Sequence, residues 1–238
     1  MSKHKTTILI LVLLSLLLVL VLATATSAAP TTDTAPTDGK AGYTGSDACK
    51  GCHNDKHTTL QETLHPWKVR PKAEANIVGN WPHEWDGVTY TLDDFDWVIG
   101  AHPKWKQRYI DIQEDGFWKI LPFQWNIDTQ EFVAYNHAGD YREDCAGCHT
   151  TGLDVTTKTW TEPGVQCEAC HGPGQDHVSG GFVNPPGERL IFAKSDPEVC
   201  GSCHTRGATK DGMYSWPEGY VPGGDVHLDD IYDVTDSD

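Results

Sequence analysis

The eight cysteines of this 238-residue chain form four copies of one pattern, Cys-x-x-Cys-His. In each copy the two thiols can form thioether bonds to the vinyl groups of a haem, and the histidine that follows then lies beneath the iron as its proximal ligand. The sequence therefore predicts four covalently attached haem c groups. The residues that would hold them are Cys49, Cys52 and His53; Cys145, Cys148 and His149; Cys167, Cys170 and His171; and Cys200, Cys203 and His204.

Disulfides and zinc sites are the alternative uses of paired cysteines in an exported chain. Neither explains why a histidine follows every second cysteine. A thioredoxin-like motif needs one such pair on a βαβ unit, and iron–sulfur clusters do not call for the histidines. Haem attachment therefore accounts best for the whole pattern.

The distal ligands of the four irons are predicted to be mainly histidines. Apart from Met1, the chain contains only Met213, so at most one haem can have His/Met ligation. Haems with two histidine ligands have lower potentials than those with a methionine ligand. Seven histidines remain between the leader and the C-terminus, of which four are needed: His57, His65, His83, His102, His137, His177 and His227.

Chain length limits what His177 can do. It lies six residues after His171, and six residues span at most about 20 Å. This reach is barely enough to round the same macrocycle, so His177 is predicted to bind a different haem. His65 follows His53 in a stretch with few helix breakers before Pro66, and a short helix is expected to present it to a neighbouring haem.

The first 29 residues have the form of a targeting segment. Lys3 and Lys5 precede an uncharged apolar run from Ile8 to Ala23, and small residues follow through Ala29. The segment predicts export by a signal peptide, with retention as a membrane anchor as the open alternative. Residues 30–45 are mostly Thr, Pro, Ala, Asp and Gly and predict a flexible linker.

The net charge of the chain is strongly negative, with 18 Lys and Arg against 34 Asp and Glu. Loss of the leader would remove Lys3 and Lys5 and increase the excess of acidic residues. This charge argues against nucleic acid and anionic lipid as partners. It suits solubility in an extracellular or salty medium, and it also suits docking to a basic redox partner.

Residues 46–224 are predicted to form one tetrahaem cytochrome c domain of mostly irregular structure and short helices wrapped around the haems, because Gly and Pro are frequent around the motifs. Strand-like runs at 108–113, 117–121 and 131–135 predict a small antiparallel β-sheet insertion at about 88–135. Residues 225–238 are rich in Asp and predict a solvated acidic tail.

The stretches around the motifs resemble the cytochrome c-554-like family of small tetrahaem cytochromes, and the likeness covers most of residues 43–224. That family includes a soluble carrier that takes electrons from hydroxylamine oxidoreductase and the OmcE-like extracellular filament-forming cytochromes. Its members share a haem array of alternating parallel and perpendicular pairs. The stretches that carry the resemblance are Ile99–Tyr109, Cys145–Gly152, Glu162–His177 and Cys200–Gly207.

The resemblance implies distal roles for four histidines, namely His65, His177, His102 and His137. It leaves His57 in doubt, and His83 and His227 have no clear counterpart. In the filament relatives one subunit lends a histidine to the next. The surplus of histidines here is compatible with self-association into filaments with such trans ligation.

Electron transfer is the function that these observations favour, either within an extracellular filament or as a discrete soluble or membrane-tethered carrier. The competing class is a multihaem reductase of small nitrogen compounds, which needs one iron with an open position. The chain has no Cys-x-x-Cys-Lys variant, and its distal candidates outnumber its irons. A non-catalytic protein that acts outside the cytoplasm, at the cell surface or in the periplasm, is therefore expected, with redox proteins or an extracellular electron acceptor as partners.

Overall fold

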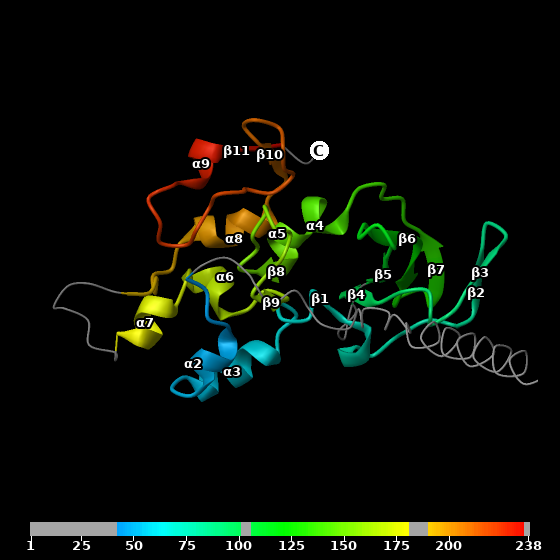
Figure 1. The fold of residues 1–238 in the computed structure, drawn as a ribbon, viewed down its shortest axis with the longest axis horizontal. Helices are drawn as coiled ribbons and strands as arrows, with labels where there is room; N and C mark the ends of the chain where they lie inside the picture. The colour runs from blue at the N-terminus through cyan, green and yellow to red at the C-terminus, as the bar shows by residue number, and fades with distance from the viewer. Residues whose placement is uncertain (1–41, 101–105, 181–189, 236–238) are drawn as a thin grey trace, which may run out of the picture. The chain divides into compact units, whose positions relative to one another are not determined.

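The computed structural model describes residues 42–100, 106–180 and 190–235 (Figure 1). The predicted leader, most of the predicted linker and His102 lie outside the described residues. The chain divides into two compact units, Met1–Thr32 and Asp33–Asp238, and every described residue belongs to the second. Within the described residues, no helix is both long enough and apolar enough to cross a membrane.

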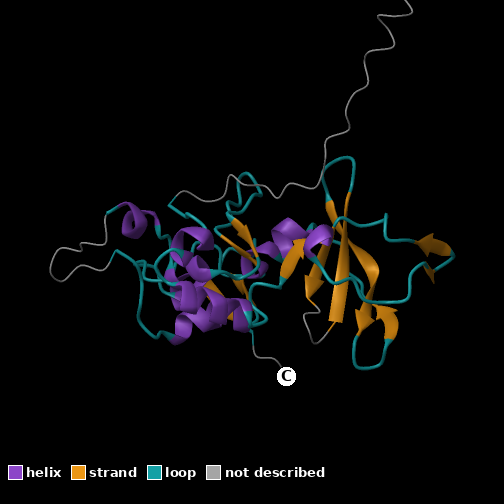
Figure 2. Ribbon diagram, turned by 90° about the horizontal axis from the view of Figure 1, so that it is seen from below, coloured by secondary structure: helices purple, strands orange, loops and turns teal. Residues whose placement is uncertain are grey.

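The helices of the described region are short, and the longest have eight residues. Glycines and prolines interrupt the chain around the motifs, which prevents longer helices from forming. Figure 2 shows most of these helices gathered beside the strands, as expected for short helices around the motifs. They are α2 (Ser46–Lys50), α3 (Asn54–Gln61), the 3-10 helix η1 (Lys72–Glu74), α4 (Tyr141–Asp144), α5 (Ala146–His149), α6 (Cys167–His171), α7 (Gln175–Ser179), α8 (Pro197–His204) and α9 (Leu228–Ile231).

A five-stranded antiparallel sheet has the strand order β1-β4-β5-β6-β7. Its last three strands confirm the three runs predicted from the sequence. The sheet also extends beyond the predicted limits of 88–135, because β1 pairs with β4. The strands are β1 (Val69–Pro71), β4 (Trp97–Gly100), β5 (Lys106–Ile112), β6 (Trp118–Asn126) and β7 (Glu131–Ala134).

Within residues 42–100, 106–180 and 190–235, three further sheets have two antiparallel strands each. The strand that begins at Val88 lies within the predicted limits, but it pairs in a separate hairpin and not in the main sheet. The pairs are β2 (His83–Trp85) with β3 (Val88–Tyr90), β8 (Thr150–Thr151) with β9 (Glu162–Pro163), and β10 (Gly207–Thr209) with β11 (Tyr232–Val234).

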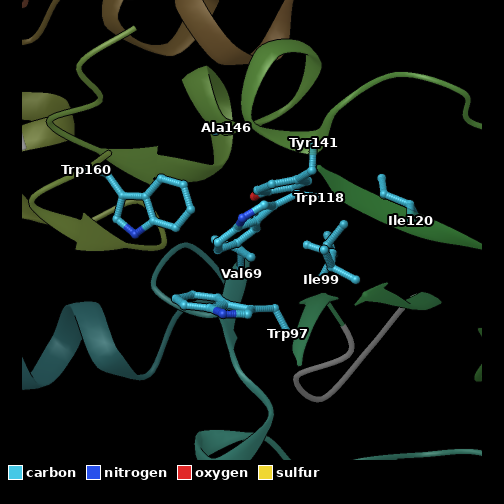
Figure 3. Close-up of a cluster of buried hydrophobic side chains, with 9 residues drawn as sticks. Val69, Trp97, Ile99, Trp118, Ile120, Tyr141, Ala146 and Trp160 are labelled. Carbon is cyan, nitrogen blue, oxygen red and sulfur yellow. The ribbon is translucent and has the colours of Figure 1, made fainter. Parts of the chain in front are cut away.

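Both faces of the five-stranded sheet are covered by apolar side chains, because successive residues of a strand point to opposite faces. Trp97 and Ile99 belong to one buried cluster, and Val98 between them belongs to the other. Figure 3 shows the first cluster, in which Trp118 and Trp160 lie with their ring centroids 5.2 Å apart. This cluster includes Ala146 of the second Cys-x-x-Cys-His motif, so the sheet supports that motif directly.

The C-terminal residues differ from the solvated tail expected from residue 225. Residues 228–234 form α9 and β11, and β11 pairs with β10. Leu228 and Tyr232 are buried, and the Tyr232 hydroxyl donates to the Ser215 carbonyl at 3.0 Å. Burial of Leu228 and Tyr232 and the pairing of β11 with β10 together hold this segment against the protein.

Candidate haem-binding site

Each of the four motifs is formed around a helical turn. The last three lie in or next to α5, α6 and α8, and the first begins in α2 and ends at the residue before α3. In the first motif the His53 amide donates to the Cys49 carbonyl at 2.9 Å. A helical turn places residues three and four apart on one face. The two thiols and the imidazole of a motif therefore lie on the same side of the backbone.

All eight cysteines are free thiols, so the disulfide alternative is not realised. Within the described residues, His, Cys, Asp and Glu side chains form no group of three that could hold a metal ion. Covalent haem attachment accounts for all three side chains of each motif, because the two thiols form the thioether bonds and the imidazole binds the iron.

Thiols of different motifs lie close to one another. Burial, followed by the nearby Cys167, Glu168 and Glu162, raises the pKa of Cys49 to about 11. A hydrogen bond from the Cys148 thiol lowers the pKa of Cys203 and raises that of Cys148 itself. The first motif is therefore next to the third, and the second is next to the fourth.

The third and fourth motifs are also neighbours. Burial is the main cause that raises the pKa of Cys170, and the charges of Cys203 and Cys200 add to it. The four motifs thus form a continuous series in the order first, third, fourth, second, although the second motif precedes the third and fourth in the sequence.

Two proximal histidines each face a second histidine. The ring centroids of His53 and His177 are 6.4 Å apart, with an interplanar angle of 20°. Those of His204 and His65 are 6.2 Å apart, with an angle of 84°. Metal–imidazole bonds are about 2 Å long, so two imidazoles on opposite sides of one metal have ring centroids separated by roughly 6.3 Å. The donor sets of the first and fourth motifs therefore fit a haem iron.

The two distal candidates come from different local structures. His177 lies in α7, six residues after His171, and faces a histidine of a different motif. The short helix expected before Pro66 is α3, but it ends at Gln61, and His65 lies beyond its end. The helix ends at Gln61 because the carbonyls of Leu60 and Gln61 bond to the Thr63 hydroxyl and the Trp67 indole.

His171 of the third motif has its Nδ1 in a hydrogen bond with the Phe192 carbonyl at 2.7 Å. Such a bond fixes the tautomer and leaves Nε2 available to a metal. A cavity of about 530 Å³ lies beside this ring, lined by Phe192, Val221 and Pro222 among others. The third motif therefore offers a ring with a fixed tautomer and open space next to it.

His149 of the second motif has the most enclosed position of the four proximal histidines. The other three are exposed, whereas His149 is partly buried and its Nδ1 has no hydrogen-bond partner among the described residues. Burial, with the charges of Lys68 and Arg108, lowers the pKa of His149 to about 4. The ring of Tyr141 lies 6.1 Å away, centroid to centroid.

Four further histidines lie in the part of the chain that the structure describes. The Nε2 of His137, a predicted distal ligand, lies 3.2 Å from Asp144. His83 stacks on Phe132 within the second aromatic cluster, at 4.0 Å between ring centroids. His227 pairs with Glu198, and His57 is exposed on α3. Among the described residues, these four are not in ring contact with a proximal histidine.

Glu168 is a functional residue that the sequence did not reveal. It lies between the cysteines of the third motif and is fully buried. Its carboxylate accepts the amides of Thr44 at 3.0 and 3.1 Å, Gly45 at 2.8 Å and Gly174 at 2.7 Å. The end of the predicted linker is therefore fastened to the third motif, beside the first.

The family model described as cytochrome c554 and c-prime matches residues 105–172, which contain the second and third motifs. Among solved structures, the outer cell wall cytochrome OcwA matches 82% of this chain with a TM-score of 0.68 and 28% identity. The chain is thus similar to multihaem c-type cytochromes in its second and third motifs and in its fold. The chain spans 45% of the length of OcwA.

A second solved structure similar to this chain is the undecahaem cytochrome from the S-layer of Carboxydothermus ferrireducens. It has 24% identity and a TM-score of 0.47, over 84% of this chain and 30% of that one. A comparison with curated proteins found no match.

Proposed function

We propose that this cytochrome transfers electrons through four covalently bound haems with mostly bis-histidine ligation. The observation that supports this most strongly is the pairing of His53 with His177 and of His204 with His65 at the separation of two axial ligands. Haem iron supplies a one-electron Fe(III)/Fe(II) couple, and two histidine ligands leave it no open position. The chain's role is to hold and space these redox centres.

The order of the motifs supports a conduit. Thiols of neighbouring motifs lie close enough to shift one another's pKa at each step of the series first, third, fourth, second. The first and second motifs are the two ends of this series. Electrons are therefore proposed to enter at one of these ends and leave at the other.

Low potentials follow from the ligand set. Met213, the one methionine beyond Met1, is 71% exposed in the loop after β10. An axial ligand has to lie opposite a proximal histidine, and the exposed Met213 side chain does not have such a position. The lower potentials of bis-histidine haems suit respiratory or extracellular electron transfer.

The site of action is proposed to be outside the cytoplasm, at the cell surface. OcwA is an outer cell wall protein by its description, and the leader of this chain has the composition of an export signal. The proposed partners are redox proteins or an extracellular electron acceptor, and the excess of acidic residues favours partners with a basic surface.

Spectroscopy of the mature ferric protein tests this function against a reductase. We expect electron paramagnetic resonance to show predominantly low-spin iron, because histidines are available on both sides of the haems. Nitrite and hydroxylamine should leave the spectrum unchanged. A stoichiometric high-spin signal that shifts on adding either compound would indicate an open iron and favour the reductase.

Assembly into a filament with trans ligation is the second candidate. The observation that favours it lies at the third motif, where the cavity beside His171 has no second histidine in its described lining. A histidine from another copy could complete such a site, and repeated head-to-tail contacts of this kind generate a helical polymer. Imaging of the secreted protein, with its spin state followed on dilution, tests this. A monomer that stays fully low-spin at all concentrations would exclude trans ligation.

A further inference from the structure

The two histidines proposed to bind the first iron are held by separate short helices. His177 lies in α7, and His53 closely follows α2, which contains Cys49. Their rings lie with centroids 6.4 Å apart. Each of these helices has five residues, and a helix of that length is not stable by itself. Contacts outside the helices therefore have to keep the two histidines at this separation.

Glu168 of α6 contacts the beginning of both helices, one with each carboxylate oxygen. Oε1 accepts the amide of Gly174, the residue before α7, at 2.7 Å. Oε2 accepts the amide of Gly45, the residue before α2, at 2.8 Å. The Thr44 amide donates to both oxygens, at 3.0 and 3.1 Å. A single planar group thus joins the starts of α2 and α7.

The Glu168 carboxylate is fully buried. Among the described residues, it has no cation within ion-pair distance, so backbone amides are its hydrogen-bond partners. Burial of a charge is costly unless hydrogen bonds compensate it, and hydrogen bonds to an ionised acceptor are stronger than those between neutral groups. The carboxylate therefore holds these amides more firmly than a neutral side chain would.

Three further hydrogen bonds support the same arrangement. The Ser46 hydroxyl, at the start of α2, donates to Glu162 at 3.0 Å and accepts the Cys167 amide at 3.3 Å. The Gln175 amide, at the start of α7, donates to the Gly42 carbonyl at 3.0 Å. The start of α2 is thus also tied to α6, and the start of α7 is tied to the segment that precedes α2.

Building on the proposed function, we infer that Glu168 is a positioning residue for the two axial histidines of the first haem. Glu168 does not touch the iron. It fixes the starts of α2 and α7, and it thereby sets both the separation of the His53 and His177 rings and their interplanar angle of 20°. Because Glu168 lies between Cys167 and Cys170, the third motif completes the iron site of the first.

Glu168→Gln tests this inference in the mature protein. The amide group has one oxygen instead of two, so either Gly45 or Gly174 loses its acceptor whichever way the side chain is turned. The low-spin electron paramagnetic resonance signal of the first haem should shift and broaden, because its two rings are no longer held at one angle. In the ferrous protein, carbon monoxide should bind to this haem at least about tenfold faster, since loss of a hydrogen bond to a charged group changes an equilibrium by about that factor or more.

Gly174→Ala is a second variant that keeps the carboxylate. A Cβ at this position would lie 3.1 Å from Glu168 Oε1, so either the carboxylate or the start of α7 has to move. The same two changes are expected at the first haem, with a smaller effect. This variant tests the inference even where Glu168→Gln does not mature.

Asp140→Asn is the matched control, because it also removes a buried carboxylate that caps a short helix, but next to the second motif. It should leave the signal and the carbon monoxide rate of the first haem unchanged, although it destabilises the protein. Both quantities are measured well below the unfolding transition, by electron paramagnetic resonance and by stopped-flow absorbance.

His177→Ala identifies the signal and the carbon monoxide phase that belong to the first haem. An unchanged signal and rate in Glu168→Gln and Gly174→Ala would overturn the inference. Equal changes in Asp140→Asn would also overturn it, because the effect would then follow from general loss of stability. An unchanged spectrum in His177→Ala would instead contradict the proposed ligation of the first iron.

Discussion

At the scale of single residues, the proposed ligation depends on two histidines outside the motifs. His177→Ala and His65→Ala should each convert one haem from low to high spin, because each variant removes a proposed distal ligand. His177 faces His53, and His65 faces His204. The two low-spin signals that disappear should differ, since one pair of rings is near parallel and the other near perpendicular. His57→Ala, an exposed position on α3, is the control and should change neither.

The measurement is electron paramagnetic resonance of the ferric variants. An unchanged spectrum for His65→Ala or His177→Ala would remove that residue from the ligand set. Such a result would not change the assignment of the attachment residues, because the thioether bonds do not depend on the distal ligand.

Glu168 is a second residue with a specific expected effect. Glu168→Gln should lower the free energy of unfolding by roughly 2–3 kcal/mol, because an amide cannot accept the Thr44, Gly45 and Gly174 amides as both carboxylate oxygens do. Denaturant unfolding of the mature protein measures this. Glu84→Gln, at an exposed position on β2, should have little effect. Equal stability of the two variants would show that the buried carboxylate does not fasten residues 44–45.

The attachment residues stay a prediction, which the sequence alone can make because their chemistry is local: two thiols and an imidazole within five positions define it. Glu168 could not, because its partners Thr44 and Gly45 lie more than 120 positions away. A carboxylate inside a Cys-x-x-Cys pair looks like an ordinary exposed residue until the fold places backbone amides around it.

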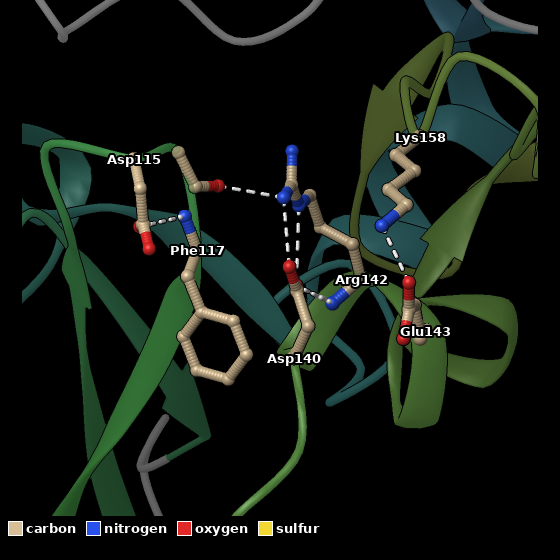
Figure 4. Close-up of polar contacts among 7 residues, drawn as sticks. Asp115, Phe117, Asp140, Arg142, Glu143 and Lys158 are labelled. Atoms are coloured by element: carbon tan, nitrogen blue, oxygen red, sulfur yellow. Dashed lines mark hydrogen bonds and ion pairs between the residues drawn. The ribbon is translucent and has the colours of Figure 1, made fainter.

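At the scale of elements, α4 connects the second motif to the sheet. Asp140 caps this helix by accepting the Arg142 amide at 2.8 Å, and it also accepts two bonds from the Arg142 side chain. The same guanidinium donates to the Gly116 carbonyl in the β5–β6 turn at 2.6 Å (Figure 4). The residues that follow α4 are Cys145 and the rest of the second motif.

Asp140→Asn should therefore destabilise the protein by roughly 2 kcal/mol at neutral pH, since the hydrogen bonds lost involve two charged groups. Burial alone would raise the pKa of Asp140, but its bonds to Arg142 outweigh burial and lower it. The stabilisation is thus present above the unfolded pKa of about 3.9 and is lost as the pH falls through the lower folded value.

Denaturant unfolding at neutral and acidic pH checks this prediction. Glu143→Gln is the matched control, because Glu143 lies on the same helix and pairs with Lys158 at the surface (Figure 4). This ion pair should contribute at most about 1 kcal/mol to the free energy of unfolding. A difference between Asp140→Asn and the unmodified protein that stays constant into the acid range would contradict the assigned role of the carboxylate.

Sequence patterns predicted β5, β6 and β7 because alternation and a Glu-Asp-Gly turn are local signals. They missed β1, which has three residues and forms only by pairing with β4. They also missed β11, where charged residues surround Tyr232 and its burial depends on contacts with β10 and Ser215. Such short strands are stabilised by pairing with other strands more than by the β-propensity of their own residues.

At the scale of the whole molecule, the central property is the continuous series of motifs. The sequence predicts four attachment sites and their spacing along the chain, but the spatial order of the motifs depends on which thiols the fold brings together. Cys49 lies by Cys167 and Cys148 by Cys203, across 118 and 55 positions. The proposed path through four haems therefore depends on the tertiary structure.

The most direct test of this account is the intact mass of the mature protein under denaturing conditions, where only covalently held groups remain. Because all eight cysteines are free and belong to four motifs, the account predicts a mass increase equal to four haems. An increase of three haems or fewer in fully matured protein would contradict it, because one attachment site would then be missing from the series.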